Sequence, residues 1–262
     1  MIRTIFKLNS IPAVLTAVFI FCILRPGCDQ PQSQSQKIQT PLKRFGSLIR
    51  LKRQFEEQYI ILHRYTFPGV LDRIQKCNIR NYSIFLSSGI LFSHFEYVGN
   101  HFETDMAQMA DSVTKDWWKL TDMMQEPLAT RKKGEWWASM KLLYQMDSLR
   151  ITTPNIRRFA FRAVLLSDRK QNLIDRLHRI DKTETGLFLN LHFQNVTVYE
   201  HDKQLYIYFE YSGSELEKDW TQLENAVTFR NLYTDIVTCL QTRQTTGKNH
   251  YWEQMRQVFH TD

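Results

Sequence analysis

The sequence predicts an α+β protein made of two ferredoxin-like domains. Segments with strand and helix patterns follow one another in the order β-α-β-β-α-β, which is the split βαβ arrangement of ferredoxin-like domains. The same order of segments recurs roughly 110–115 residues further along the chain of 262 residues. Self-similarity at one fixed spacing indicates that the domain has been duplicated.

The first copy contains six patterned segments. In chain order they are a strand at 44–51, an amphipathic helix from 55 to 63 that is expected to continue past Pro68 to 77, strands at 81–86 and 90–97, a largely helical stretch at 102–124, and a closing segment at 135–146. A Ser-Ser-Gly turn at 87–89 joins the two middle strands and predicts a β-hairpin.

The second copy repeats these segments. In chain order they are a strand at 158–165, a helix at 173–179, strands at 196–199 and 205–211, helical motifs at 226–228 and 233–235, and a tail at 252–260. Leu-His-Arg occurs in both first helices, and both third strands end with Phe-Glu-Tyr. A Thr-Thr-Pro-Asn break at 152–155 separates the copies, so we expect domains at 43–149 and 156–262.

The N-terminal residues 1–27 predict a signal peptide. Arg3 and Lys7 precede an apolar run at 11–24, which is short for a membrane span and typical of a signal-peptide core. The protein is therefore expected to be exported.

Cys28 is a candidate lipidation site. It follows Gly27 at the point where a bacterial lipoprotein signal would be cut, although Arg25 stands where such signals usually carry Leu. A plain secretory signal or an uncleaved anchor is the alternative. Residues 28–42 are rich in Gln, Ser and Pro and predict a flexible tether. We expect a bacterial lipoprotein of the periplasm or outer membrane.

The net charge of +7 is confined to the N-terminal region. Residues 1–53 carry nine Lys and Arg against one acidic residue, whereas residues 54–262 carry 25 basic and 26 acidic residues. The body of the protein therefore lacks the basic surface of a nucleic-acid-binding protein. No His/Cys cluster has metal-ligand spacing, and we expect neither a metal nor a cofactor.

Five side chains of the first copy suggest a site for a monosaccharide. Tyr59 and His63 are four residues apart and share one helix face, and Tyr82 lies on the second strand. Trp117 and Trp118 supply flat aromatic surfaces. Each residue alone is more often a core or surface residue. Together they offer proton-transfer groups and indoles that stack on the apolar face of a sugar.

The first copy resembles the L-rhamnose mutarotase family over roughly residues 43–147. The motifs that carry the resemblance are Glu56-Glu-Gln-Tyr-Ile-Ile-Leu-His63, Phe67-Pro68, Ile79-Arg-Asn-Tyr-Ser-Ile-Phe-Leu86, Leu91-Phe92 and Asp116-Trp-Trp118. The resemblance implies a ferredoxin-like domain that dimerises sheet to sheet. It also implies that His63 is a proton donor, with Tyr59, Tyr82 and the Trp pair around the sugar.

The first copy departs from the family at two places. Gly69 follows Phe67-Pro68 where the family usually has an acidic residue, and the tail ends Leu143-Tyr144-Gln145 where the family usually has Val-Phe. The tail of the second copy, Gln257-Val-Phe-His260, is closer to the family ending. These departures bear on which sugar is bound more than on the reaction.

The second copy has lost most of the site residues. We expect His178 to match His63, but Ile174 stands in place of Tyr59 and Val196 in place of Tyr82. The Trp pair is matched by Asn231-Leu232 in a helix expected to be shorter. This copy is therefore expected to be a structural partner that forms an intrachain pseudo-dimer, which leaves the protein a monomer.

The function that these residues favour is anomer interconversion of L-rhamnose or a related 6-deoxy-hexose, through acid–base ring opening. His63 is the candidate acid and Tyr59 its partner, with the two roles open to exchange. A non-catalytic cell-surface sugar-binding protein is the main alternative. A different enzyme on the same scaffold, such as a small monooxygenase, is the third, because one fold hosts many functions.

Overall fold

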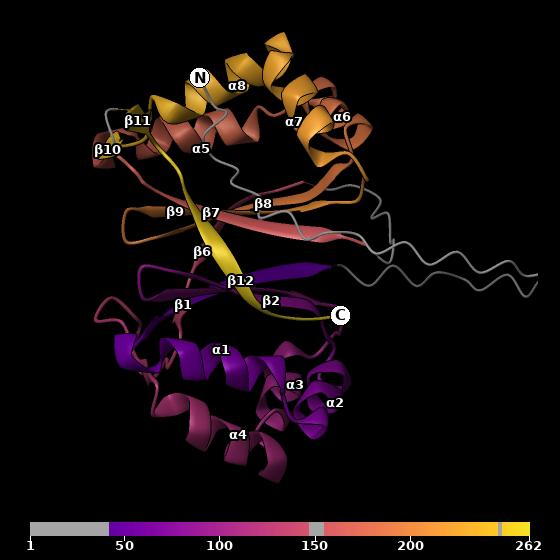
Figure 1. Ribbon diagram of the computed structural model, residues 1–262, viewed down its shortest axis with the longest axis vertical. Helices are drawn as coiled ribbons and strands as arrows, with labels where there is room; N and C mark the ends of the chain where they lie inside the picture. Colours follow the sequence, from indigo (N-terminus) through magenta and orange to yellow (C-terminus); the bar gives the residue numbers. More distant parts are fainter. Residues whose placement is uncertain (1–41, 147–154, 246–247) are drawn as a thin grey trace, which may run out of the picture. The chain divides into compact units, whose positions relative to one another are not determined.

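The computed structural model describes residues 42–146, 155–245 and 248–262 (Figure 1). The first half of the protein, residues 43–146, contains β1 (Lys43–Leu51), η1 (Arg53–Phe55), α1 (Glu56–Arg64), α2 (Pro68–Lys76), β2 (Ile79–Ser87), β3 (Ile90–Tyr97), α3 (Phe102–Gln108), α4 (Ser112–Asp122), β4 (Gln125–Glu126), β5 (Ala138–Ser139) and β6 (Lys141–Gln145). The expected signal peptide, Cys28, most of the tether and most of the break between the copies lie outside the described residues.

The second half, residues 156–262, repeats this order. Its elements are β7 (Arg157–Val164), η2 (Ser167–Arg169), α5 (Lys170–His178), α6 (Lys182–Asn190), β8 (Phe193–His201), β9 (Gln204–Tyr211), α7 (Leu216–Asn225), α8 (Val227–Val237), β10 (Arg243–Thr245), β11 (Lys248–His250) and β12 (Glu253–Thr261). The expected strands are confirmed with shifts of a few residues at their ends, whereas α6 and α7 were not among the segments expected for the second half.

Two expected helices of the first half are each divided in two. The helix expected to run from 55 to 77 ends at Arg64, and α2 begins at Pro68. Proline lacks a backbone N–H and restricts the residue before it, so Pro68 begins a helix instead of continuing one. The helical stretch at 102–124 is broken at Asp111, whose side chain caps α4 by accepting from the Thr114 N–H at 2.8 Å.

Ten of the described strands form one curled antiparallel sheet, and β10 and β11 form a separate two-stranded sheet. The order of the larger sheet is β4-β1-β3-β2-β12-β7-β9-β8-β6, with β5 paired to β1. The last strand of the second half, β12, therefore pairs with β2 of the first half as well as with β7 of its own half. The last described strand of the first half, β6, pairs with β8 of the second half. Each half therefore contributes its last strand, which we call its tail, as a neighbour of the second strand of the other half.

Most elements of the first half are related to those of the second half by one offset in residue number. The elements η1, α1, β1 and β3 each have a counterpart that begins 114 residues later, in η2, α5, β7 and β9. Both second strands carry an irregularity at the same place, after Arg80 and after Gln194. Asn81 and Asn195 adopt left-handed conformations there, with φ of 49° and 55°. This register supports the duplication in detail.

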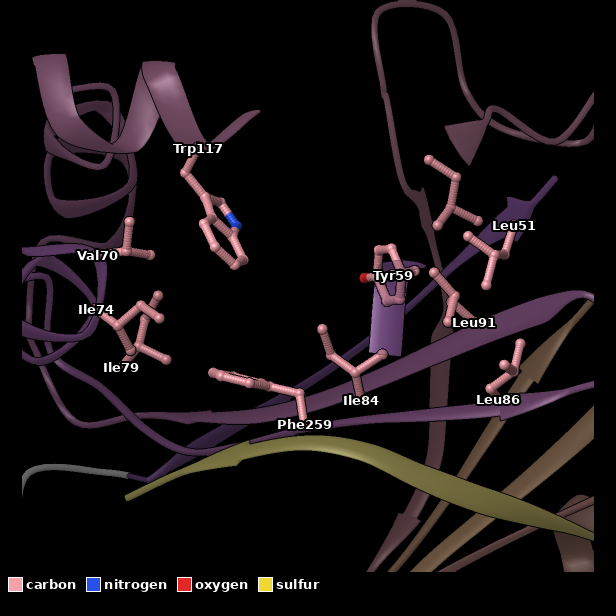
Figure 2. Close-up of a cluster of buried hydrophobic side chains, with 11 residues drawn as sticks. Leu51, Tyr59, Val70, Ile74, Ile79, Ile84, Leu86, Leu91, Trp117 and Phe259 are labelled. Atoms are coloured by element: carbon pink, nitrogen blue, oxygen red, sulfur yellow. The ribbon is translucent and has the colours of Figure 1, made fainter. Parts of the chain in front are cut away.

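The hydrophobic residues form three clusters. The first cluster gathers helices α1, α2 and α4 on the first half's sheet, and Figure 2 shows its core residues. The second cluster does the same for the second half. The third joins strand residues of both halves, among them Phe85, Phe92, Tyr199 and Tyr208. Strand faces that no helix covers are therefore buried against strands of the other half.

A buried polar network also links the halves. The Asn81 Nδ2 donates to Glu210 Oε1 at 2.6 Å, and the Asn195 Nδ2 donates to Glu96 Oε1 at 2.7 Å. These two hydrogen bonds exchange places under the 114-residue offset, so they form a symmetric pair. Arg158 donates from Nε to Asn81 Oδ1 at 3.1 Å. Because buried carboxylates are costly unless hydrogen-bonded, the network favours this pairing of strands over others.

No described helix is long and apolar enough to span a membrane. Among the described residues, no group of three His, Cys, Asp or Glu side chains is placed to hold a metal ion.

Candidate functional site

The helix α1 places Tyr59 and His63 on its buried face. Their spacing of four residues is about one helical turn, and the two rings lie against each other with centroids 4.0 Å apart and planes tilted by 31°. The His63 Nδ1 lies 2.9 Å from the backbone oxygen of Tyr59. A carbonyl oxygen only accepts hydrogen bonds, so this contact assigns the ring proton of neutral His63 to Nδ1. The Nε2 atom is then left as the acceptor.

All five predicted site residues line one cavity of about 450 Å³. Tyr59 and His63 come from α1, Tyr82 from β2, and Trp117 and Trp118 from α4. A cavity of this size, with a largely apolar wall rich in aromatic rings and with a few polar groups, is typical of small-molecule sites. The sequence therefore identified residues that the fold brings together.

The two tryptophans occupy different environments. Trp117 is 6% exposed and meets the His63 ring edge-on at 5.2 Å, so it belongs to both the core and the cavity wall. Trp118 is 37% exposed and also lines the cavity. Their separation of about 100° around the helix axis explains the difference. Trp118 can therefore be changed at a lower cost in stability than Trp117.

The second half contributes an aromatic ring to this region. Phe259 on β12 pairs with Ile84 of β2 and lies 5.6 Å from the His63 ring and 5.4 Å from the Tyr82 ring, both edge-on. Figure 2 shows Phe259, Tyr59 and Trp117 extending into the same region. One feature of the sequence pointed to Phe259, namely the family-like tail at 257–260. It did not show that this tail crosses to the other half.

Residues after α4 add polar groups that the sequence prediction missed. The Gln125 Nε2 lies 3.4 Å from the Tyr59 hydroxyl, and the Trp136 Nε1 donates to Gln125 Oε1 at 3.1 Å. This chain of contacts orients the phenol of Tyr59. Asp122, at the end of α4, lines the same cavity. The signals for them were adjacency to the Trp pair and the Glu135-Trp136-Trp137 motif of the tail.

Burial sets the protonation states in the cavity. Burial lowers the pKa of His63 to about 4, partly opposed by the hydrogen bond to the Tyr59 backbone, so the imidazole is neutral at pH 7. Burial raises the pKa of Tyr82 to about 12 and raises the pKa of Tyr59 well above its usual range. Burial also raises the pKa of Asp122. The cavity at pH 7 therefore offers a neutral imidazole and protonated phenols.

The second half has an apolar core where the first half has its site. At the offset of 114 residues, Leu173 matches Tyr59 and Leu177 matches His63, and both leucines are buried in the second cluster. The expectation that His178 matches His63 is wrong by one residue, and His178 is exposed on α5. Aligning the shared Leu-His-Arg triplet placed the two helices one residue out of register. The correct alignment matches the buried positions of the two helices and not the identical residue types.

The helix with the Trp pair also keeps its length. Both α4 and α8 have 11 residues, so the expected shortening is wrong. Their first residues are 115 apart, which matches Trp117 with Leu232 instead of with Asn231. Leu232 is buried. Leucines thus replace the Tyr, His and Trp of the first half and fill the corresponding space.

Comparison with protein families gives one match, which lies in the first half. Residues 44–146 match the family model of L-rhamnose mutarotase. The resemblance expected from the sequence is confirmed over these residues. The matched range ends at the last described residue of the first half, so the comparison assigns no family to the second half. No curated protein matches the chain.

Two solved structures share the fold of both halves. A monooxygenase candidate from Lactobacillus acidophilus NCFM is 6% identical, with a TM-score of 0.53, and the match covers 83% of this chain and 95% of that one. A monooxygenase candidate from Fusobacterium nucleatum is 9% identical, with a TM-score of 0.52, over 85% and 94% of the two chains. At these identities the likeness concerns the fold alone.

Proposed function

We propose that this protein is a mutarotase that interconverts the α and β anomers of L-rhamnose or a related 6-deoxy-hexose. The observation that carries the proposal is that Tyr59, His63, Tyr82 and the Trp117-Trp118 pair line one cavity within the matched domain. A volume of about 450 Å³ accommodates one monosaccharide with bound water.

The protonation states support a base role for His63. Its neutral imidazole holds the proton at Nδ1 through the contact with the Tyr59 backbone, so Nε2 can accept the proton of the anomeric hydroxyl. As this O–H bond breaks, the C1=O1 bond forms and the bond from C1 to the ring oxygen breaks. This assignment reverses the acid role expected for His63, because an imidazole with a pKa of about 4 is not charged at pH 7.

The buried phenols support the acid role. Tyr59 and Tyr82 stay protonated at neutral pH, and either hydroxyl can give a proton to the departing ring oxygen. Rotation about C1–C2 then presents the other face of the aldehyde, and the same steps in reverse close the ring. The proton taken by His63 returns to O1, so atoms and charges balance over one cycle.

The aromatic walls favour a 6-deoxy sugar. Trp117 and Phe95 line the cavity with apolar rings, and a methyl group at C6 avoids leaving a hydroxyl unpaired against them. Trp118 is exposed enough to stack on a sugar that enters from solvent.

Saturation-transfer NMR on added L-rhamnose tests the proposed function. Saturating the signal of one anomer should reduce the signal of the other in proportion to protein concentration. Binding without such transfer would mean a sugar-binding protein, the main alternative. If L-rhamnose and L-fucose showed no binding and no transfer, the proposed sugar function would be excluded. That outcome would favour another reaction on this scaffold.

We also propose that the two halves form an intrachain pseudo-dimer in which the second half is structural. The symmetric hydrogen bonds of Asn81 and Asn195 and the exchanged tails support this arrangement. The apolar replacement of its site supports the absence of a second reaction centre.

Export with a lipid on Cys28 remains a further proposal. It rests on the apolar run at 11–24 and on the Gly27-Cys28 pair. Mass spectrometry of the mature N-terminus tests it. A diacylglyceryl adduct on Cys28 is expected, and an N-terminus at Met1 or at an unmodified residue would exclude it.

A further inference from the structure

A second cavity of about 510 Å³ lies where strands of the two halves meet. Leu48, Arg50 and Ile90 line it from the first half, and Arg162, Val164 and Gln204 line it from the second half. It shares no lining residue with the cavity around His63. It is therefore a separate space that the proposed reaction does not use.

These lining residues are matched pairs under the 114-residue offset. Leu48 corresponds to Arg162, Arg50 to Val164, and Ile90 to Gln204. The cavity thus lies on the approximate two-fold axis that relates the halves. In each pair one member is apolar and the other is polar, so after duplication the wall diverged to carry charge.

Glu253 does not neutralise the arginines of this wall. Its carboxylate accepts from Arg162 Nη2 at 3.0 Å, is paired with Arg243, and also accepts from Ser87 and from Ser88. One carboxylate therefore serves two guanidinium groups. Although burial opposes it, these hydrogen bonds lower the pKa of Glu253 to about 2, so the cluster keeps one positive charge at any neutral pH.

Arg50 adds a second positive charge. Its side chain is exposed and forms no ion pair within the described part of the chain. Asp202 is the one carboxylate in the lining itself. With Glu253 counted, three guanidinium groups face two carboxylates. Thr130 and Gln204 add neutral hydrogen-bonding groups.

We propose that this cavity binds a small anion of monosaccharide size, whose carboxylate or phosphate group is held by Arg50, Arg162 and Arg243. Planar guanidinium groups match the oxygens of carboxylates and phosphates, often with two parallel hydrogen bonds. The volume of about 510 Å³ exceeds what a bare inorganic ion needs, which favours an anion attached to a small polar body. The polar groups of Thr130 and Gln204 suit its hydroxyls.

Isothermal titration calorimetry at low salt tests this site with three probes. D-glucuronate carries a carboxylate, D-glucose 6-phosphate carries a phosphate, and D-glucose carries neither. At least one anion should bind while glucose does not, and the anion that binds identifies the charged group. Added NaCl should weaken the binding, because exposed charge pairs are screened.

Arg50→Gln is the deciding variant because Arg50 is exposed and unpaired. It should weaken anion binding roughly fivefold or more, as expected for losing a charged hydrogen bond. Arg53→Gln, exposed on η1 and outside the cavity, is the matched control and should bind as the unchanged protein does. Arg162→Lys keeps the charge beside Glu253 and should reduce affinity less than Arg50→Gln if the protein melts normally.

Two results would overturn the proposal. One is the absence of binding by both anions at low salt in a protein that melts cooperatively. The other is equal affinity in the unchanged protein and in Arg50→Gln. Both results leave the mutarotase proposal untouched, because its cavity and its NMR assay are independent of these residues.

Discussion

The two halves share one fold but differ in what fills the space beneath their helices. In the first half, α1 presents Tyr59 and His63 to a cavity, whereas in the second half α5 presents Leu173 and Leu177 to a packed core. Both helices are therefore packed on their sheets, although the side chains on their buried faces differ. The first half carries side chains that can transfer protons in this space, whereas the second half carries leucines at the matching positions.

The interface between the halves shows the opposite pattern. Residues that join the halves keep their identity in both copies. The matched pairs are Asn81 and Asn195, and Glu96 and Glu210, which bond across the halves. Arg158 also donates to Asn81 across the halves, and its counterpart Arg44 pairs with Glu96 of the same network. The residues that bond between the halves are thus the same in both copies, whereas the residues beneath α1 and α5 differ.

The largest difference between the halves should appear at the histidines. His63→Ala removes the base and should abolish catalysed anomer exchange. His178→Ala should leave the exchange unchanged, because His178 is exposed and lies beside the matching position. Saturation-transfer NMR measures both variants. Equal losses at unchanged folding would mean that the halves do not differ as described.

The exchanged tails predict a second asymmetry. Phe259→Leu removes two edge-on ring contacts, with His63 and Tyr82, and should lower kcat/KM by up to about tenfold. Tyr144→Leu is the matched control, because Tyr144 occupies the same place in β6 and packs on the second half. Its activity should stay within twofold of the unchanged protein. A larger loss from Tyr144→Leu than from Phe259→Leu would show that the tails do not act as placed here.

The Trp pair sharpens the distinction between core and site. Trp117→Ala should cost roughly 3–5 kcal/mol of stability, because Trp117 is buried in the first cluster. Trp118→Ala should change stability little but weaken L-rhamnose binding several-fold. Thermal melts and NMR titration separate the two effects. Normal sugar affinity in Trp118→Ala would remove the stacking role.

The buried imidazole of His63 predicts a dependence of stability on pH. The pKa of His63 is about 4 in the folded protein and about 6.5 when unfolded, so the unfolded state takes up the proton first as the pH falls. The free energy of unfolding should therefore fall between pH 6.5 and pH 4. This group should contribute a loss of about 2 kcal/mol from pH 7 to pH 5.

Denaturant unfolding of His63→Gln provides the comparison. The variant should show a shallower decline of stability over the same pH range. Parallel curves for the unchanged protein and the variant would contradict the buried, neutral imidazole.

Much of the fold followed from patterns in the sequence. The hairpin at 81–97 and its counterpart at 196–211 were predicted because alternating apolar residues flank a tight turn. The break at Pro68 could have been predicted from proline geometry, but the apolar period continues through it. The exchange of tails could not have been predicted from the sequence. The strands β6 and β12 have similar patterns, so either could pair with either half, and only the packing of both halves decides between them.

The sequence predicted those residues of the candidate site that lie in local motifs. Tyr59, His63, Tyr82, Trp117 and Trp118 come from local motifs of one family and meet in one cavity. Phe259 was missed because it is nearly 200 residues from His63 and reaches the site only through β12. The false match of His178 shows that shared letters are a weaker guide to position than the buried face of a helix.

The second half packs Phe259 against His63 and Tyr82 and covers strand residues of the first half, so we expect the first half to depend on it. Sedimentation and anomer exchange on a fragment of residues 43–147 test this dependence most directly. The fragment lacks Phe259 and exposes strand faces that β7, β8 and β9 cover in the full chain. It should aggregate or form homodimers, with activity below that of the full chain. A stable monomer with full anomer-exchange activity would contradict this expectation.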